Sequence, residues 1–193
     1  MGAAGANVVL VKRDGDSAQI SGTGQPIENV QILAINEFDS KRKCMSVVVR
    51  IAKRVSGSDT PSVGEGAGVD ESQLEWGPPT LLCKGADSAV FSNCNKSRYY
   101  DICKVHVDDF ACNGLRTLVM AQRVLSETEF ESWHERYKVG SKSLANRKEM
   151  LQRCAEEIGE YFLLSFIDTI VDFISKFIDL SRSRFDVAGC CGY

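Results

Sequence analysis

The sequence lacks the long apolar segments and the strong charge imbalance that mark membrane-spanning and nucleic-acid-binding chains. No run approaches the roughly 18 consecutive apolar residues that a transmembrane helix needs. The formal net charge of −3 creates no field that would attract nucleic acid. We therefore expect no nucleic-acid partner, and we expect this chain by itself to be soluble.

A secretory signal is also missing, and this decides how the 8 cysteines are interpreted. Residues 1–6 lack the charged start and apolar core of a signal peptide, so we expect a flexible N-terminus, a cytoplasmic location and reduced thiols. Cys94, Cys103, His106 and Cys112 include no paired C-x-x-C. Because structural zinc sites favour such pairs, free thiols are favoured and no metal site is predicted.

Phosphate-loop and catalytic motifs are absent as well. The glycine-rich segment Gly64–Gly68 fits neither G-x-G-x-x-G nor G-x-x-x-x-G-K-[ST]. His106 and His134 have no recognisable nucleophile partner at motif spacing. We predict no catalytic residue in this chain, and a self-contained kinase or hydrolase is disfavoured.

The sequence does contain a series of short strand patterns joined to helical patterns. Strands are predicted at residues 7–13, 18–21, 29–35, 45–52, 80–83 and 115–121. The stiff β-branched residues Val47 to Val49 make 45–52 the clearest of them. Strands and helices alternate only loosely, so the predicted class is α+β, a twisted antiparallel sheet flanked by helices.

Helical periodicity appears in three places. Residues 101–113 place Ile102, Val105 and Phe110 where they are available to face a core. Ser126 to Glu129 form a capping box, and the helix that follows carries Phe130, Trp133 and Tyr137 on one face. The third helix is predicted at about residues 146–160.

Two segments depart from this alternation. Residues 56–80 hold five glycines, three prolines, five acidic residues and no Lys or Arg, which predicts a mobile loop. Residues 165–180 place Phe166, Ile170 and other apolar residues opposite acidic ones, which predicts an amphipathic helix. A helix that packs on the domain or on nothing is favoured over one that lies on a membrane surface, because membrane-surface helices usually have a basic polar face and this one is acidic. Self-association through this helix is the further role considered.

Several residues near predicted strand ends are of the types that bind a nucleotide. An aromatic ring at Phe38 can stack on a purine, and Met45 offers an adaptable apolar wall. Lys84 precedes Gly85, where the missing side chain permits close backbone approach. Arg116 has the planar donor fork that suits phosphate oxygens.

Each of these residues also has an ordinary structural explanation. An aromatic at a strand end, such as Phe38, is more often part of a core than a stacking platform. The basic triplet Lys41 to Lys43 is of a kind usually found on a solvated face, and Lys84 and Arg116 fit an ordinary surface.

Taken together, the motifs resemble the nucleotide-binding domain of P-type ATPases, and within it the phospholipid-flippase branch. The resemblance rests on Glu37 to Lys43, Met45 to Arg50, Leu82 to Ser88 with its Lys-Gly-Ala-Asp motif, Phe110, Gly114 to Leu118, Ser126-Glu127, Glu131 to Trp133, and Tyr137. It covers residues 7–164, which leaves 165–193 as a divergent tail.

The resemblance implies a role for each candidate residue. Phe38 stacks on adenine, Met45 and Lys84 line the base pocket beside Gly85, Lys43 lies toward the phosphates and Arg116 contacts the phosphate chain. The ligand is then ATP, bound as its magnesium complex in the complete protein. The complete protein is a membrane protein that moves phospholipid between leaflets, with this domain in the cytosol.

Departures from the family limit what the chain can do alone. It contains no Asp-Lys-Thr-Gly-Thr phosphorylation motif, so we expect a fragment that does not turn over ATP. Asp39 and Cys44 stand where flippases usually carry a small polar residue and a basic one. The alternative is a non-catalytic truncated interaction module that keeps the fold without binding ATP.

Overall fold

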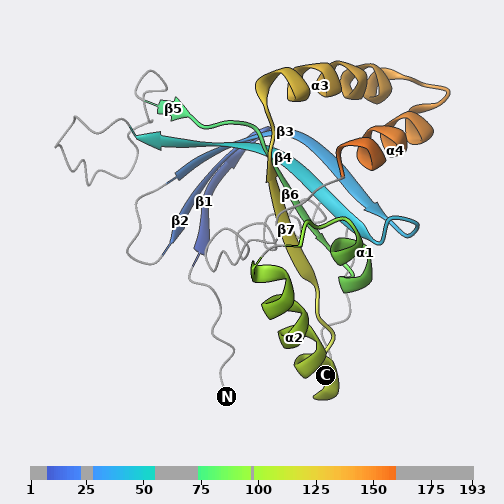
Figure 1. The fold of residues 1–193 in the computed structure, drawn as a ribbon. Coiled ribbons are helices and arrows are strands. Elements are labelled where there is room, and N and C mark those ends of the chain that lie inside the picture. Colours follow the sequence, from blue (N-terminus) through green and yellow to red (C-terminus); the bar gives the residue numbers. More distant parts are fainter. Residues whose placement is uncertain (1–7, 23–27, 55–73, 97, 160–193) are drawn as a thin grey trace, which may run out of the picture.

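One antiparallel sheet of 7 strands organises the molecule, and the computed structural model describes it over residues 8–22, 28–54, 74–96 and 98–159 (Figure 1). The strand order is β1-β2-β3-β4-β6-β7, with β5 paired to β4 off this path. The strands are β1 Val8–Asp14, β2 Ser17–Gly22, β3 Glu28–Asp39, β4 Cys44–Arg54, β5 Leu74–Trp76, β6 Thr80–Gly85 and β7 Val119–Val124. The described helices are α1 Asp87–Ser92, α2 Arg98–Cys112, α3 Glu127–Lys142 and α4 Arg147–Ile158.

The predicted class, an antiparallel sheet flanked by helices, is confirmed, but one strand was missed, the strand predicted at 29–35 continues to Asp39, and the last strand begins later than predicted. Residues 74–76 were assigned to the loop, whereas they form β5 and pair with Ala52 to Arg54. A strand of three residues is too short to show a periodic pattern. The last strand begins at Val119 instead of residue 115, because its pairing with β6 ends where Val119 meets Gly85.

Other predictions lie outside the described residues. They concern residues 1–6, most of the 56–80 loop, and the tail 165–193 with its amphipathic helix, so each stays a prediction. Within the described ranges, no helix is long and apolar enough to cross a membrane.

Both faces of the sheet bury apolar side chains, which explains the continuous run Val47 to Val49. Val48 and Leu81 belong to the cluster that also contains Trp133 and Ile158 from α3 and α4. Val47 and Leu82 belong to a second cluster, built from strand residues such as Val30. Because successive strand residues point to opposite faces, the two clusters lie on opposite sides of β4 and β6.

Helix α2 packs through a different stripe from the one predicted. Ile102, Val105 and Phe110 remain 41%, 65% and 45% exposed. Val107 is buried instead, with Tyr100 and Cys103 packed against the same cluster. These three positions follow the i, i+3, i+7 spacing of one helix face. The apolar residues of this helix are spread around its circumference, so periodicity alone did not select the correct face.

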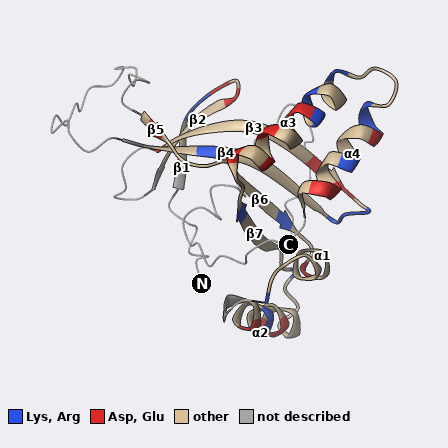
Figure 2. Ribbon diagram, turned by 45° about the horizontal axis from the view of Figure 1, so that its top comes forward, with Lys and Arg blue, Asp and Glu red and all other residues tan. Residues whose placement is uncertain are grey.

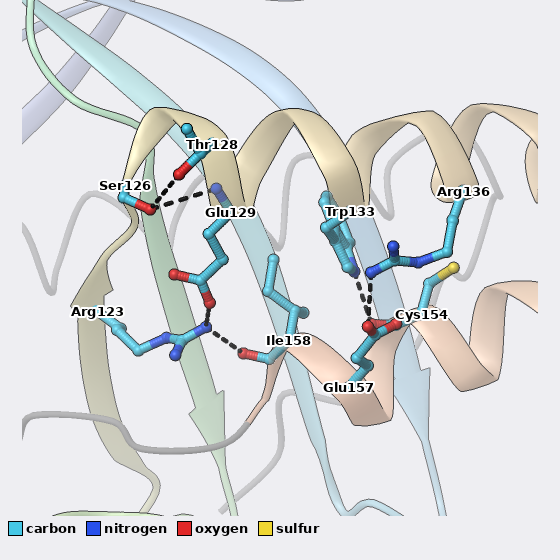
Figure 3. Close-up of polar contacts among 9 residues, drawn as sticks. All are labelled: Arg123, Ser126, Thr128, Glu129, Trp133, Arg136, Cys154, Glu157 and Ile158. Carbon is cyan, nitrogen blue, oxygen red and sulfur yellow. Dashed lines mark hydrogen bonds and ion pairs between the residues drawn. The ribbon is translucent and has the colours of Figure 1, made fainter.

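Helices α3 and α4 are joined to each other and to β7 by polar contacts (Figure 3). Ser126 Oγ accepts a hydrogen bond from the Glu129 N–H at 3.2 Å, as the capping box predicts. The Glu129 carboxylate pairs with Arg123 of β7 at 2.5 Å. The indole Nε1 of Trp133 donates to the carbonyl oxygen of Cys154 at 2.8 Å, which connects the buried faces of both helices.

Tyr137 fastens α3 to the middle of β3. Its hydroxyl donates to the carbonyl oxygen of Ile35 at 2.9 Å and accepts from the Ile35 N–H at 3.2 Å. The register between β2 and β3 runs only from Glu28 to Gln31, so Ile35 lies beyond it. One side chain therefore satisfies both backbone groups of a strand residue.

We expect Tyr137→Phe to lower the free energy of unfolding by about 1–3 kcal/mol, because the Ile35 N–H and C=O lose their partner in a partly buried place. Urea denaturation measures this loss. Tyr100→Phe is the control, since Tyr100 contributes its ring, which meets Phe91 edge to face at 5.2 Å. Equal effects of the two substitutions would contradict the assigned role of the Tyr137 hydroxyl.

Candidate functional site

The turn between β3 and β4 is shaped by Asp39. Its Oδ1 accepts hydrogen bonds from the backbone N–H groups of Lys41 at 2.6 Å and Arg42 at 3.3 Å. These bonds, led by the one from Lys41, lower the pKa of Asp39. The N–H of Lys43 donates to the Asp39 carbonyl oxygen at 2.7 Å, and Lys43 itself takes a φ of +53°. Asp39 thus fixes the conformation of the whole basic triplet.

The three basic residues of this turn have different surroundings. Lys41 pairs with Glu156 of α4 at 3.1 Å, and Arg42 donates to the carbonyl oxygen of Ala155 at 2.9 Å. Lys43 is exposed, and its ammonium makes no ion pair or hydrogen bond within the described part of the chain. Figure 2 shows this turn as a basic tip close to α4. Lys43 is therefore the member of the triplet whose charge is free to meet a ligand.

A row of side chains crosses the sheet just inside that turn. Met45 of β4 stands directly opposite Lys84 of β6, and Lys84 stands opposite Met120 of β7. By strand alternation, this row continues the face that carries Val47 and Leu82. Lys84 is only 9% exposed there. A buried lysine is uncommon, and its charge acts more strongly than it would in water.

Phe38 extends the row onto β3 through a β-bulge. Asn36 pairs with Ser46 and Asp39 with Cys44, so Glu37 and Phe38 together stand opposite Met45. A bulge of this kind re-aims the side chains that it carries. The Phe38 ring is 56% exposed, which contradicts the core role considered for it and leaves an aromatic face open to solvent. Phe38, Met45, Lys84 and Met120 therefore come from four neighbouring strands.

Gly85 permits a close approach between β4 and β6. A Cβ built on Gly85 would lie 2.4 Å from the Cβ of Cys44 and 2.7 Å from the carbonyl oxygen of Lys43. That same carbonyl oxygen accepts a hydrogen bond from the Ala86 N–H at 2.9 Å. The close approach at Gly85 in this structure is between two strands, next to the Met45–Lys84 pair, and a role of Gly85 in binding a nucleotide stays a prediction.

Arg116 lies at the same edge of the sheet as this junction. It is exposed and belongs to the connection between α2 and β7, three residues before Val119, which pairs with Gly85. The start of β4, the end of β6 and the start of β7 meet at Gly85. Lys43, in the turn before β4, and Arg116, in the connection before β7, therefore lie at the same end of these strands. The predicted strand at residues 115–121 included Arg116, whereas the observed strand β7 begins at Val119 and leaves Arg116 in the preceding connection.

Met120 is the member of the row that the sequence did not reveal. It stands opposite Lys84 only because β6 pairs with β7, and two helices separate these strands in the chain. No local pattern encodes such a register. The binding roles of Phe38, Lys43, Met45, Lys84, Gly85 and Arg116 stay predictions.

The predicted free thiols Cys94, Cys103 and Cys112 and the imidazole of His106 lie on or near α2. Cys94 and Cys103 are partly buried, whereas His106 and Cys112 are exposed on α2. Among the residues that the structure describes, no group of 3 or more His, Cys, Asp or Glu side chains is arranged to hold a metal ion.

Comparison with known proteins identifies relatives of this arrangement. The family model described as P-type ATPase, cytoplasmic domain N, matches residues 15–155, which include every member of the row. The phospholipid-transporting ATPase DNF1 of Saccharomyces cerevisiae is 36% identical over 140 residues, or 69% of this chain. The probable phospholipid-transporting ATPase 7 of Arabidopsis thaliana is 30% identical over 171 residues, or 86% of this chain. The chain spans 8% and 12% of the lengths of these two relatives.

We expect Gly85→Ala to destabilise the fold by about 1–3 kcal/mol or more, because the added methyl group meets backbone and Cβ atoms that cannot rotate away. The measurement is the urea midpoint together with the slope of the transition. Gly15→Asn is the control, since nothing lies within 4 Å of a Cβ at Gly15 and Asn tolerates its φ of +53°. An unchanged midpoint for Gly85→Ala would contradict the close approach.

Proposed function

The chain belongs to the P-type ATPase family as a cytoplasmic domain N, and we propose that it binds ATP by holding adenine over the Phe38–Met45–Lys84–Met120 row. The observation that carries this proposal is the buried cation in that row. Lys84 is 9% exposed on a face built from apolar side chains, with Met45 and Met120 directly beside it. A ligand that offers both a flat apolar surface and hydrogen-bond acceptors fits such a place.

The adenine ring matches the chemistry of the row. Phe38 supplies an exposed aromatic face for stacking, and Met45 and Met120 supply adaptable apolar walls. The Lys84 ammonium is a hydrogen-bond donor of the kind that ring nitrogens accept, and its low exposure reduces competition from water. In this proposal Gly85 contributes indirectly, by holding Lys84 and Met45 opposite each other.

With adenine on the row, the phosphates would extend past the ends of the strands, toward Lys43 and Arg116. Both residues are exposed and positively charged, and they come from connections that flank the Gly85 junction. The base is held by packing and the phosphates by solvated charges, so the two halves of the ligand are recognised by different forces. Magnesium would accompany the phosphates as part of the MgATP complex.

In the wider protein, we propose that this domain delivers ATP for phospholipid transport between membrane leaflets. The support is the similarity to phospholipid-transporting ATPases over 69% to 86% of this chain. The phosphoryl transfer and the lipid pathway belong to domains with motifs that this sequence does not contain. The described residues therefore contribute nucleotide binding and positioning, and no reacting group.

We expect Phe38→Ala and Lys84→Met each to raise the Kd for ATP by about 5- to 150-fold, which corresponds to the 1–3 kcal/mol typical of base stacking and of a charged hydrogen bond. Isothermal titration measures the affinity, and thermal unfolding verifies that each variant is folded. Phe110→Ala is the control, because Phe110 is a similarly exposed phenylalanine on α2. Undiminished affinity in the first two variants would place the adenine elsewhere, and no binding by the unaltered chain would favour the interaction module.

We expect Lys43→Ala and Arg116→Ala each to weaken ATP binding by about 2- to 5-fold, as solvated charge pairs usually contribute up to about 1 kcal/mol. Their affinity for adenosine should stay unchanged, because adenosine has no phosphates. Titrations with both ligands at two salt concentrations make the comparison, since salt screens exposed charges. A parallel loss of adenosine affinity would show that these residues act on the base or on the fold.

A further inference from the structure

We propose that Cys44 and Cys83 form an oxidation-sensitive thiol pair behind the Met45–Lys84 pair. Cys44 would react first with a hydroperoxide, and Cys83 would then close a disulfide between β4 and β6. All described cysteines are free thiols in this structure, so the pair is assigned in its reduced state.

The strand register places the two cysteines on one face of the sheet. Cys44 stands opposite Gly85, and Cys83 stands opposite Ser46, so the two thiols are diagonal neighbours on adjoining strands. Both belong to the cluster that packs against the helices. Met45 and Lys84, each the next residue in the chain, therefore point to the other face.

The missing side chain of Gly85 brings the thiols together. Directly opposed Cβ atoms in an antiparallel sheet are usually about 4.5–5.5 Å apart. The Cys44 Cβ lies only 2.4 Å from the position that a Gly85 Cβ would occupy, so Cys44 is displaced toward β6. The two thiols are near enough for each to shift the pKa of the other.

The surroundings of the two sulfurs favour different roles. The hydrogen bond from Cys83, aided by the charge of Arg42, lowers the pKa of Cys44 to about 7 against the opposing effects of burial and Asp39. The same hydrogen bond, together with burial and the nearby thiol of Cys94, raises the pKa of Cys83. The pKa of Cys44 is thus the lower of the two, so in this proposal Cys44 is the nucleophile and Cys83 supplies the proton.

Arg42 adds a fixed positive group beside this pair. Its guanidinium donates to the carbonyl oxygens of Cys44 at 3.2 Å and of Ala155 in α4 at 2.9 Å. Its Nε is buried and has no hydrogen-bond partner within the described part of the chain. A cation held in place by two carbonyl groups stabilises an anionic sulfur nearby.

The chemistry balances with hydrogen peroxide as the oxidant. The Cys44 thiolate attacks the O–O bond, which breaks to give a sulfenic acid and, after protonation, one water. The Cys83 sulfur then attacks the sulfenic sulfur, the S–S bond forms, and the departing hydroxyl leaves as a second water with the Cys83 proton. Two thiols lose two electrons in total, and the peroxide is reduced by two electrons.

A disulfide here would disturb the nucleotide site, an effect that rests on the proposed function. Disulfide geometry sets the two Cβ atoms about 3.8 Å apart, which is shorter than the separation usual for diagonal neighbours. The strands must shift against each other, and Met45 and Lys84 shift with them because they directly follow the bonded residues. We expect the oxidised chain to bind ATP about 10-fold more weakly, with recovery after reduction.

The test is peroxide treatment of the purified chain followed by peptide mass spectrometry. A peptide that joins Cys44 to Cys83 is the expected product, and a sulfenic acid on Cys44 should accumulate in Cys83→Ser. Cys112→Ser is the control, because Cys112 is exposed on α2 and should not alter the product. Cross-links among other cysteines, or a Cys44 sulfenic acid that persists in the unaltered chain, would overturn the pair.

Two further measurements separate the parts of the proposal. The rate of Cys44 oxidation should rise with pH and reach half its maximum near pH 7, as its thiolate forms. A midpoint near pH 9 would overturn the nucleophile assignment. If the disulfide forms and ATP affinity does not change, the coupling to the nucleotide site is wrong and the thiol pair stands. If the reduced chain binds no ATP, the proposed function fails, whereas the mapped disulfide is unaffected.

Discussion

The close approach of β4 and β6 at Gly85 is the constraint on which the arrangement of this end of the two strands depends. A strand of L-amino acids with side chains at every position would be held farther from its neighbour. Because Gly85 lacks a Cβ, the Lys43 carbonyl reaches the Ala86 N–H and Cys44 of β4 lies directly against the backbone of β6 at Gly85. Asp39 sets the shape of the basic turn, and the contact at Gly85 joins the end of that turn to β6 beside the Met45–Lys84 pair and the two thiols.

Local patterns in the sequence correctly predicted strands and helix faces that depend on the types and spacing of neighbouring residues. Val47 to Val49 are buried in β4, and Phe130 and Trp133 are buried on one face of α3, as their spacing indicates. The patterns failed where a distant partner decides the outcome. Val107 is buried in α2 because of how the helix meets the sheet, and β5 exists only because β4 extends far enough to pair with it.

The candidate site divides in the same way. Phe38, Met45 and Lys84 stand out by residue type and by their place at strand ends, so sequence alone suggested them. Met120 joins them through the β6–β7 register, and the exposure of Phe38 depends on a bulge, neither of which a single sequence encodes. Lys84 is buried and Lys43 is exposed, and this difference also required the folded structure, because the residue type is the same at both positions.

The contact between Tyr137 and Ile35 has a consequence for how this domain meets other molecules. Among the described residues, the β2 ladder on the outer side of β3 ends at Gln31, and the Ile32 N–H still donates to the Asp16 carbonyl oxygen at 2.7 Å. Strand edges left without a ladder partner attract further strands from neighbouring chains. The Tyr137 hydroxyl occupies the N–H and the C=O in the middle of that edge, while α3 covers it from above. The Tyr137 hydroxyl thus makes these two backbone groups unavailable for pairing with a strand of another chain. The same strand, β3, carries Phe38 near its end.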